Sequence, residues 1–353
     1  MHVLALNLGS TSTKVGVFTD RVCVLEETIR HDKETLVRFP SILLQQPLRQ
    51  RLLEELLSSK GFDLAAFDMY AVRCGLIRPV AGGAWYVNDA VIQDAVSGAY
   101  GEHAANIGLL IAKVWSDQYG VPAVFIDAPV TDELNPLARY SGYAGYPRRS
   151  VFHALNARRV VHLYCRDKGL DPARSSFIVA HMGGGITVSA WKDLKAIDVT
   201  NGVDGEGPFS PERVGALSHV SVLKLLADLG GDPKAVRAAL YTKGGLQSYL
   251  GTNDVRALCG RAAEEPETKQ VLDAMLYTIR KSIGAMAAVL EGRVQAVLLT
   301  GGLAYNQGLM DDLKSRLAWL APCAVYPGED ELAALHEGAL RCLNGEEEAK
   351  TLV

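Results

Sequence analysis

Three glycine-rich turns, each directly after a short apolar run, are the segments of this sequence best suited to chemistry. They span residues 9–12 (Gly-Ser-Thr-Ser), 183–185 (Gly-Gly-Gly) and 301–302 (Gly-Gly). Glycine at the end of a strand lets the backbone approach a ligand closely and leaves N–H groups accessible to phosphate oxygens. One such turn alone is more often a plain tight turn, but three of them favour a site for the phosphates of a nucleotide.

The first turn carries further donors, because it has hydroxyl side chains and Lys14 follows it. The chain has no G-x-x-x-x-G-K-[ST] motif, which excludes a P-loop enzyme. It also has no G-x-G-x-x-G that opens a helix, so a Rossmann cofactor site is unsupported. A nucleotide site in this protein would therefore be assembled from separate turns.

Two of these turns belong to similar strand–turn–strand patterns. Aligning Asn7 with His181 also aligns Gly9 with Gly183. The offset is 174 residues, close to half of the 353-residue chain. A supersecondary unit repeated at half the chain length is typical of a duplicated domain. Two unrelated hairpins would explain this single coincidence about as well.

The remaining elements alternate between helix and strand. Apolar residues at helical spacing predict helices over residues 150–168, 270–291 and 330–343. Short apolar runs predict strands at residues 294–299 and 324–326. The class is therefore α/β with mixed sheets.

Composition limits the partners of the protein. A length of 353 residues suits two domains, and 48% hydrophobic residues support a large core. The formal net charge of −4 gives no reason to expect nucleic acid or an anionic membrane as a partner.

The 6 cysteines and 8 histidines are scattered without metal-ligand spacing. The apolar start is short and lacks a basic region, and no apolar helix is long enough to span a bilayer, so we expect a cytoplasmic protein.

Longer segments resemble the butyrate kinases of the acetokinase family, within the actin-like ATPase superfamily that also includes sugar kinases and heat-shock ATPases. These segments run in family order over nearly the whole chain and comprise residues 150–156, 180–186, 204–213, 250–254, 299–305 and 326–331. The resemblance implies two duplicated ribonuclease-H-like domains with an interdomain cleft. It assigns residues 1–148 with 334–353 to the N-terminal domain and residues 149–333 to the nucleotide-binding domain, with a hinge near residues 149 and 333.

The same resemblance implies a reaction: the γ-phosphate of ATP is transferred in line, with Mg²⁺, to the carboxylate of a short-chain acid such as butyrate. A carboxylate is already ionised at pH 7 and needs no general base. The difficulty is to bring one anion up to another and to stabilise the transferring phosphoryl group. Such an enzyme should be rich in arginine and histidine at its site.

The catalytic residues implied by the resemblance follow that expectation. Arg73, directly after an apolar strand, would bind the substrate carboxylate and the phosphoryl group, and Arg213 would bind that group from the other domain. His153 and His181 would donate hydrogen bonds to phosphate oxygens, and Asp127 would assist at the metal.

The implied ligand sets are larger. The residues matching the nucleotide-binding positions are Asn7, Gly9, Ser10, Ser12, Lys14, Gly183, Gly184, Gly185, Gly301 and Gly302. The last two would lie under the adenosine, where a side chain would collide with the base or ribose. Asp127 and Glu331 would hold Mg²⁺, partly through water.

Each of these residues also has a plain structural explanation. Taken alone, Arg73 is better explained by a surface salt bridge, Asp127 by a turn at a strand end, and Glu331 by the preference for acids in the first turn of a helix. The resemblance favours the functional roles.

The chain departs from the family pattern at two places. Leu8 replaces a proline in the first turn, with little expected consequence because proline only presets the turn. Residues 218–220 (Ser-His-Val) replace a glycine-rich stretch that could shape the acyl pocket, so the preferred acid stays open. Acetate, propionate or a branched-chain acid are alternatives to butyrate.

Two other functions stay open on the same fold. A non-catalytic actin-like ATP-binding module would leave the two arginines without a role. A sugar kinase would need a catalytic aspartate to deprotonate a hydroxyl group, for which Asp127 is the candidate. The family also implies a homo-oligomer.

Overall fold

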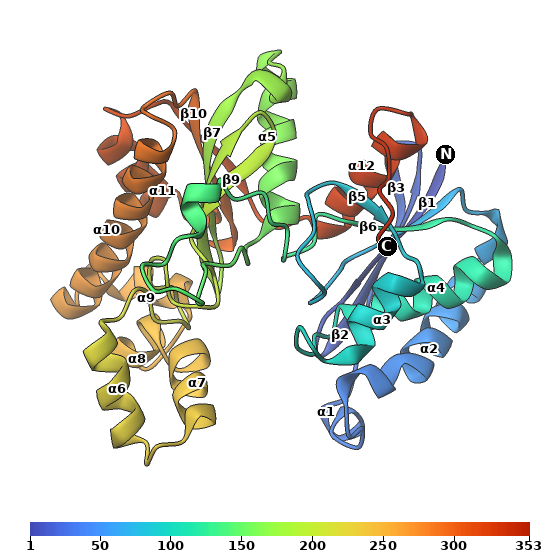
Figure 1. Ribbon diagram of the computed structural model, residues 1–353, viewed down its shortest axis with the longest axis horizontal. Coiled ribbons are helices and arrows are strands. Elements are labelled where there is room, and N and C mark those ends of the chain that lie inside the picture. The colour runs from blue at the N-terminus through green and yellow to red at the C-terminus, as the bar shows by residue number, and fades with distance from the viewer. The chain divides into compact units, whose positions relative to one another are not determined.

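The computed structural model describes residues 1–353. The chain forms two compact units, which we describe separately: unit 1 is Met1–Thr131 with Asp330–Val353, and unit 2 is Asp132–Glu329 (Figure 1). The domain division expected from the sequence, residues 1–148 with 334–353 and residues 149–333, stays a prediction. No helix has both the length and the apolar character needed to cross a membrane.

Unit 1 is built on a 6-stranded sheet. In spatial order its strands are β3 (Val22–Arg30), β2 (Ser12–Thr19), β1 (His2–Leu8), β4 (Met69–Val72), β6 (Ala123–Ile126) and β5 (Ala84–Tyr86). The first three strands are antiparallel, β4 and β6 run parallel to β1, and β5 is antiparallel to β6.

Unit 2 is built on a 5-stranded sheet. Its strands, in spatial order, are β9 (Lys195–Val199), β8 (Ile186–Lys192), β7 (Ser176–Met182), β10 (Ala296–Gly301) and β11 (Cys323–Pro327). Here too the first three strands are antiparallel, and β10 and β11 run parallel to β7.

The predicted repeat is therefore confirmed. Both sheets share the order third, second, first and fourth strand, followed by one more parallel strand, β6 in unit 1 and β11 in unit 2. Strand β5 is an addition at the edge of unit 1, and β7 begins and ends 174 residues after β1. Even the irregularity between the second and third strands recurs, after Val17 in unit 1 and after Ala190 in unit 2. This is the ribonuclease-H-like topology expected of the actin-like ATPase fold.

Helices cover both faces of each sheet. In unit 1 they are α1 (Lys33–Leu36), α2 (Gln46–Ser59), α3 (Asp89–Ser97), α4 (Asn106–Tyr119) and α12 (Glu331–Leu343), with 3₁₀ turns at Ile42–Gln45 and Leu64–Ala66. Strand residues Leu4, Leu6 and Leu8 are buried in one core with side chains of α2, α3 and α4. The alternate residues of β1 face the other side, where α12 packs.

Unit 2 repeats this arrangement, with the sheet between α5 and the pair α10 and α11 in Figure 1. Its α-helices are α5 (Ala154–Lys168), α6 (His219–Asp228), α7 (Pro233–Thr242), α8 (Gly245–Leu250), α9 (Val255–Arg261), α10 (Pro266–Val289) and α11 (Gln307–Leu317). Its 3₁₀ turns are Pro136–Arg139, Pro172–Arg174 and Gly302–Tyr305.

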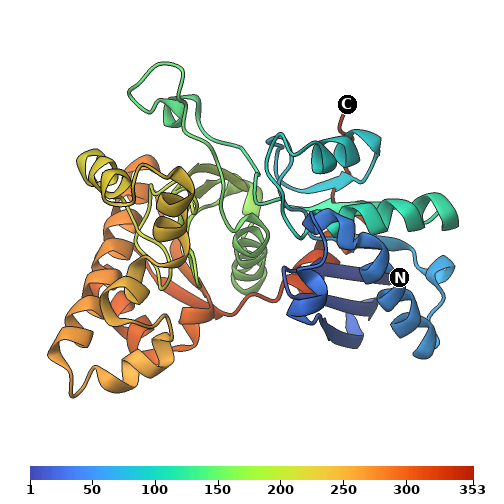
Figure 2. The ribbon, with the colours of Figure 1, turned by 90° about the horizontal axis from the view of Figure 1, so that it is seen from below.

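The predicted helix at 150–168 begins later than expected, at Ala154, with His153 as its N-cap residue. The 330–343 helix was predicted within one residue. In Figure 2 the green segment near residue 140 projects as a long loop that contains one 3₁₀ turn.

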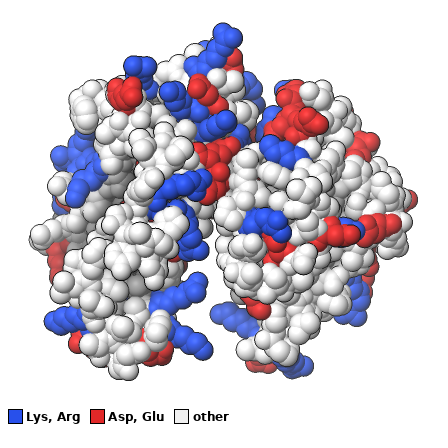
Figure 3. Space-filling model, viewed as in Figure 1, with Lys and Arg blue, Asp and Glu red and all other residues white.

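In each unit, one helix that packs on the sheet follows along the chain from a strand of the other unit. Helix α5 follows β6 along the chain but packs against β7 and β10, and α12 follows β11 but packs against β1, β4 and β6. The chain therefore passes between the units twice, in the segments that precede these two helices. On the face shown in Figure 3, positive and negative side chains are interspersed over both units, as the small net charge implies.

Candidate active site

Asn7 and Arg73 lie side by side at the carboxyl ends of two parallel strands. Strands β1 and β4 pair with Leu6 beside Val72, so the next residue of each strand reaches the same edge of the sheet. The Arg73 backbone N–H donates to the Leu6 carbonyl oxygen at 2.9 Å, which fixes the start of the arginine side chain. The parallel pairing of β1 and β4 therefore decides where this arginine can act.

Glu331 joins these two residues. Its carboxylate lies 3.2 Å from Arg73 Nε, and it accepts a hydrogen bond from Asn7 Nδ2. Arg73 Nη1 donates to Asn7 Oδ1 at 3.4 Å. The side chains of Arg73 and Glu331 are 29% and 19% exposed, so solvent and ligands can reach the ion pair. Three residues predicted for three different roles thus form one cluster, which we call the β1–β4 cluster.

Helix α12 places Glu331 in this cluster. Glu331 is the first residue of the helix, and Asp330 caps it by accepting a hydrogen bond from the Ala333 N–H at 3.2 Å. An acid at this position also interacts favourably with the helix dipole. The position of Glu331 therefore fits its structural explanation, and its role at the metal stays a prediction.

The first glycine-rich turn closes beside the cluster. The Gly9 N–H donates to the Ser12 carbonyl oxygen at 2.8 Å. Lys14 is the cross-strand partner of Asn7, so both side chains lie on the same face of the sheet, and Lys14 and Ser10 are exposed. A Cβ added at Gly9 would meet nothing closer than Ser12 at 3.6 Å, so the fold itself does not demand glycine there.

Asp127 follows β6 at the same edge of the sheet, but the surrounding backbone engages it. Its φ is +43°, a conformation that costs a non-glycine residue energy. Its carboxylate accepts the Gly83 N–H at 2.7 Å, and its own N–H donates to the Gly83 carbonyl oxygen at 3.0 Å. These bonds fit the turn explanation, and the strained backbone fits a functional position.

His103 is a residue near Arg73 that the sequence reasoning missed. Its Nδ1 accepts the Ala105 N–H at 3.1 Å, so the neutral ring carries its proton on Nε2. Burial and, to a smaller extent, the positive charge of Arg73 lower the pKa of His103 to about 4. The ring is therefore neutral at pH 7. No motif pointed to it, because its neighbour Arg73 is 30 residues earlier in the chain.

In unit 2, Arg213 lies over the second glycine-rich turn. A Cβ added at Gly185 would stand 2.6 Å from Arg213 Nη1, so any larger residue would push this guanidinium group from its position. Ser210 links the loop to the turn, since its hydroxyl donates to the Gly184 carbonyl oxygen at 2.6 Å and accepts the Arg213 N–H at 3.1 Å. Arg213 and residues 183–185, which were assigned separate roles from the sequence, are thus neighbours within this unit.

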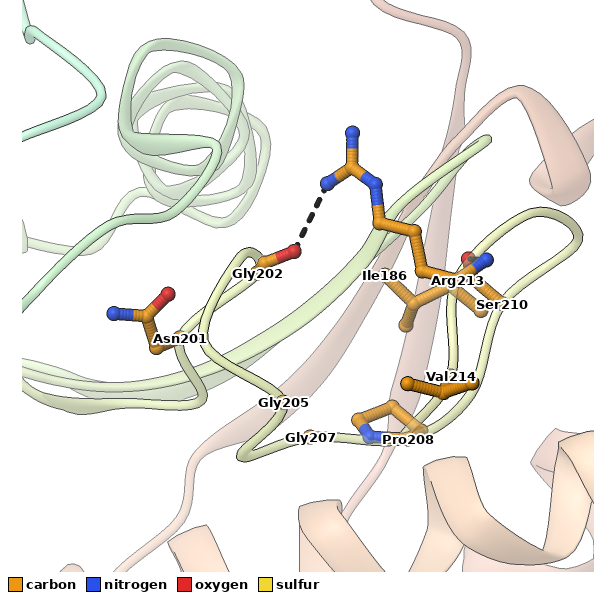
Figure 4. A pocket seen from close by; sticks show the side chains of 9 residues that line it. All are labelled: Ile186, Asn201, Gly202, Gly205, Gly207, Pro208, Ser210, Arg213 and Val214. Atoms are coloured by element: carbon orange, nitrogen blue, oxygen red, sulfur yellow. Dashed lines mark hydrogen bonds between the residues drawn. The ribbon is translucent and has the colours of Figure 1, made fainter. Parts of the chain in front are cut away.

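Figure 4 shows the small pocket beside this turn, in which Arg213 Nη1 donates to the Gly202 carbonyl oxygen at 2.9 Å. Its lining residues are Ile186, Asn201, Gly202, Gly205, Gly207, Pro208, Ser210, Arg213 and Val214. The other end of the Arg213 guanidinium points away from the Gly202 carbonyl in this view. One arm of the guanidinium is thus bonded while the rest is available to an anion.

The two predicted histidines stack on each other. The rings of His153 and His181 are 3.8 Å apart between centroids and 9° from parallel. His153 Nδ1 lies 2.9 Å from Thr187 Oγ1, on the neighbouring strand β8. His181 Nε2 lies 3.0 Å from a carboxylate oxygen of Glu329. Sequence reasoning named both histidines but not their contact.

Asn156 fixes the tautomer of the His181 ring. Its Nδ2, which can only donate, lies 2.9 Å from His181 Nδ1 and 3.0 Å from Thr300 Oγ1. The Thr300 hydroxyl donates onward to the Gly328 carbonyl oxygen at 3.3 Å. Nδ1 of His181 must therefore accept, and the proton of the neutral ring is on Nε2. Asn156, one helical turn after His153 on the buried face of α5, was the available signal in the sequence.

The two glycines of the third glycine-rich turn differ in the space around them. At Gly301, where φ is +89°, an added Cβ would lie 2.4 Å from the Met182 carbonyl oxygen, so the packing of β10 on β7 alone demands glycine. At Gly302 an added Cβ would have nothing within 4 Å. The adenosine role expected of both residues stays a prediction, and Gly302 is the one that faces open space.

The departure at residues 218–220 begins a helix. Ser218 is the N-cap of α6 and accepts the Ser221 N–H at 3.1 Å. Val220 and Leu223 on that helix are 77% and 66% exposed. A role in the acyl pocket stays a prediction.

Two duplicated ribonuclease-H-like sheets, with glycine turns at the ends of their first strands, define a protein of the actin-like ATPase fold. Solved structures agree with this class. Porphyromonas gingivalis acetate kinase matches with a TM-score of 0.80 at 18% identity, over 96% of this chain and 99% of that one. A propionate kinase from Francisella tularensis subsp. tularensis SCHU S4 matches with a TM-score of 0.76 at 16% identity, over 95% and 98%.

Sequence comparison identifies the family. Residues 148–319 match the acetokinase family. A protein named probable butyrate kinase from Clostridium botulinum (strain Alaska E43 / Type E3) is 44% identical over 349 residues, which cover 99% of this chain and 98% of the relative. The chain belongs to the acetokinase family.

Proposed function

We propose that this protein transfers the γ-phosphate of ATP to the carboxylate of a short-chain fatty acid, with butyrate as the first candidate. The observation that carries the proposal is the 44% identity, over 99% of the chain, to a probable butyrate kinase. The protein is a phosphotransferase with a carboxyl group as acceptor, and the reaction gives ADP and an acyl phosphate. It is reversible, because an acyl phosphate can return its phosphoryl group to ADP.

The role proposed for Arg73 is supported by its contacts. Its planar guanidinium group can hold two oxygens of a carboxylate or phosphoryl group at once. It is held by Asn7 and Glu331 yet remains 29% exposed. An incoming anion can therefore replace part of these contacts without moving the arginine far. Positive charge at this point offsets the repulsion between the acid and the terminal phosphate.

In unit 2 the proposed donors to the phosphates are side chains and backbone N–H groups. Arg213 offers the nitrogens that do not bond Gly202, and Gly184 and Gly185 offer backbone N–H groups, whereas the Gly183 N–H donates to the Gly185 carbonyl oxygen. His181 carries on Nε2 the proton that Asn156 keeps in place; it would donate to a phosphate oxygen in exchange for Glu329, and His153 stacks on its ring. Such preorganised donors stabilise the charge that develops on the transferring group.

Magnesium is the proposed cofactor, with Asp127 and Glu331 as its protein ligands. No group of three or more acidic, histidine or cysteine side chains is placed to hold a metal ion. The two carboxylates of Asp127 and Glu331 suit Mg²⁺, which takes one or two carboxylates and completes its shell with water and phosphate oxygens. When bound, the ion would neutralise charge on the phosphates.

A panel of acids tests the reaction directly. The purified protein is incubated with ATP, Mg²⁺, hydroxylamine and acetate, propionate, butyrate, isobutyrate or valerate, and the acyl hydroxamates are quantified. We expect a hydroxamate from butyrate and a gradual ranking of the others, because one methylene in an apolar pocket changes binding by only about 1–3 kcal/mol. ADP formation that no acid stimulates would instead favour an ATP-binding module.

A cytoplasmic location and homo-oligomeric assembly belong to the same proposal. They are supported by family membership. Size-exclusion chromatography with light scattering would measure the assembly, and a monomer at micromolar concentration would contradict it.

A further inference from the structure

Arg49 is a fully buried arginine, 0% exposed, that projects from α2 into the back of the first glycine-rich turn. Nothing in the sequence marked it, since it sits among the polar and apolar residues of an ordinary amphipathic helix. Burying a guanidinium group is costly unless its donors are satisfied. The partners of Arg49 therefore indicate what the burial serves.

All the partners of Arg49 are neutral oxygens. Nη1 donates to the Gly9 carbonyl at 2.7 Å, to the Ser12 carbonyl at 3.3 Å and to Thr13 Oγ1 at 3.4 Å. Nη2 donates to the Ser10 carbonyl at 2.9 Å. Nη2 and Nε also donate to Gln45 Oε1, at 2.7 and 3.1 Å. No carboxylate balances this charge.

These bonds orient the turn. In a trans peptide the carbonyl and the N–H point in opposite directions. Because the Gly9 and Ser10 carbonyls point inward at Arg49, the N–H groups of Ser10 and Thr11 point outward. Neither N–H donates a hydrogen bond within the protein, and both residues are exposed. The arginine thus turns two unpaired donors toward the side on which a ligand would arrive.

The charge itself is retained. Burial lowers the pKa of Arg49 to about 10, which still leaves the group protonated at pH 7. The neighbouring His31 responds to that charge: burial and then Arg49 lower the pKa of His31 to about 4. His31 is therefore neutral at pH 7, with its Nε2 2.9 Å from Thr13 Oγ1.

We propose that Arg49 is a positioning residue for the polyphosphate of the nucleotide. It holds residues 9–12 from behind, so that two backbone N–H groups face the phosphates, and it places a permanent positive charge beneath them. An anion bound in front of the turn supplies the negative charge that no carboxylate of the protein provides for Arg49. The inference rests on the proposed function, because it assumes that the first turn binds ATP.

The test compares a triphosphate with a monophosphate. Binding of a non-hydrolysable ATP analogue with Mg²⁺ and of AMP is measured by calorimetry for the full-length wild type, Arg49→Met and Arg49→Lys, alongside thermal unfolding. We expect Arg49→Met to weaken the analogue about tenfold or more and AMP less than about threefold, because charge-assisted bonds to the turn act on the outer phosphates. Arg49→Lys keeps the charge but not the fork, and should lie between.

Arg158→Lys is the matched control. This arginine of α5 is also buried, 6% exposed, but it pairs with Glu133 and lies over the ring of Trp191. Its substitution should lower the melting temperature without changing the ratio of analogue to AMP affinity. A merely structural Arg49 would behave in the same way.

The outcomes separate the two proposals. If the wild type binds the analogue and a folded Arg49→Met keeps the wild-type ratio of affinities, the inference is wrong and the proposed function stands. If Arg49→Met does not fold, an unchanged ratio in Arg49→Lys overturns it. Wild-type protein that does not bind the analogue overturns the proposed function and this inference together.

Discussion

The turns after β1 and β7 occupy equivalent places in two duplicated sheets, yet the arginine that contacts each turn lies on a different side of it. The turn at residues 9–12 is held from behind by the buried Arg49. The turn at residues 183–185 is overlain by Arg213, which the glycine at position 185 accommodates. Duplication has preserved the backbone pairing, which the core requires, while the side chains around each turn have diverged.

The equivalent residues Asn7 and His181 show the same divergence. Each bonds a carboxylate near the start of α12: Asn7 bonds Glu331, the first residue of the helix, and His181 bonds Glu329, which precedes it. The amide in unit 1 also touches Arg73, whereas the imidazole in unit 2 is fixed by Asn156. One position thus supports an arginine in the first sheet and presents a proton donor in the second.

The largest expected effect comes from the two arginines proposed to bind the transferring phosphoryl group. Arg73→Lys and Arg213→Lys should each lower kcat by about 100- to 1,000-fold, because loss of one preorganised donor to the transition state costs roughly 2.7–4 kcal/mol. Steady-state hydroxamate assays measure this. Arg139→Lys, which alters a bidentate pair with Asp132 elsewhere in unit 2, should leave turnover unchanged. Normal turnover in Arg213→Lys would mean that the second turn works through its backbone alone.

The third turn allows a matched pair of glycine substitutions. Gly301→Ala should destabilise the protein by about 2 kcal/mol or more, because φ is +89° and the methyl group meets the Met182 backbone. Gly302→Ala should leave the melting temperature nearly unchanged and weaken ATP binding if adenosine lies over it. Thermal unfolding and nucleotide titration distinguish the two. Unaltered ATP affinity in Gly302→Ala would contradict the adenosine role.

Asn156→Leu sharpens the comparison of Asn7 with His181. Without the amide, His181 can place its proton on either nitrogen, so kcat should fall by about tenfold, which corresponds to about 1.4 kcal/mol. The fall should appear in kcat while the KM for ATP stays nearly unchanged, which general damage to the core would not produce. An unchanged kcat with a lowered melting temperature would argue that Asn156 only supports the core.

The smallest expected effect concerns pH. His31 and His103 have pKa values lowered from 6.5 to about 4, mainly by burial, so the unfolded chain binds more protons than the folded one between these values. Stability should therefore be complete above pH 6.5 and decrease as the pH falls toward 4. Urea unfolding across this range measures it, and His31→Asn should flatten part of the slope. Stability that rises on acidification would contradict the assignment.

Much of the fold follows from local patterns. The 174-residue repeat, the strand at 324–326 and the helix at 330–343 were predictable because apolar periodicity and glycine turns are properties of neighbouring residues. The helix at 150–168 was predicted four residues too long at its start, where residues 150–153 lead from the loop into α5. Its apolar pattern does not mark where the first helical hydrogen bond forms.

Part of the candidate site was predicted from local patterns. The three glycine turns can be read along the chain and indicated a phosphate site. The roles of Arg73, Arg213, His181, Asp127 and Glu331 came from the resemblance, and all of these assignments stay predictions. Arg49, His103 and Asn156 went unnoticed, because each acts on residues 25 to 40 positions away.

Residue order alone therefore specifies the duplicated sheets and the places where their backbones turn, because burial of alternating side chains is a local requirement. It leaves open which polar side chain will meet which turn. The packing of α2 on the first sheet and of α5 on the second decides this, because it brings Arg49 under one turn and Asn156 against His181. A buried polar group must find partners, and those partners exist only once the core has closed.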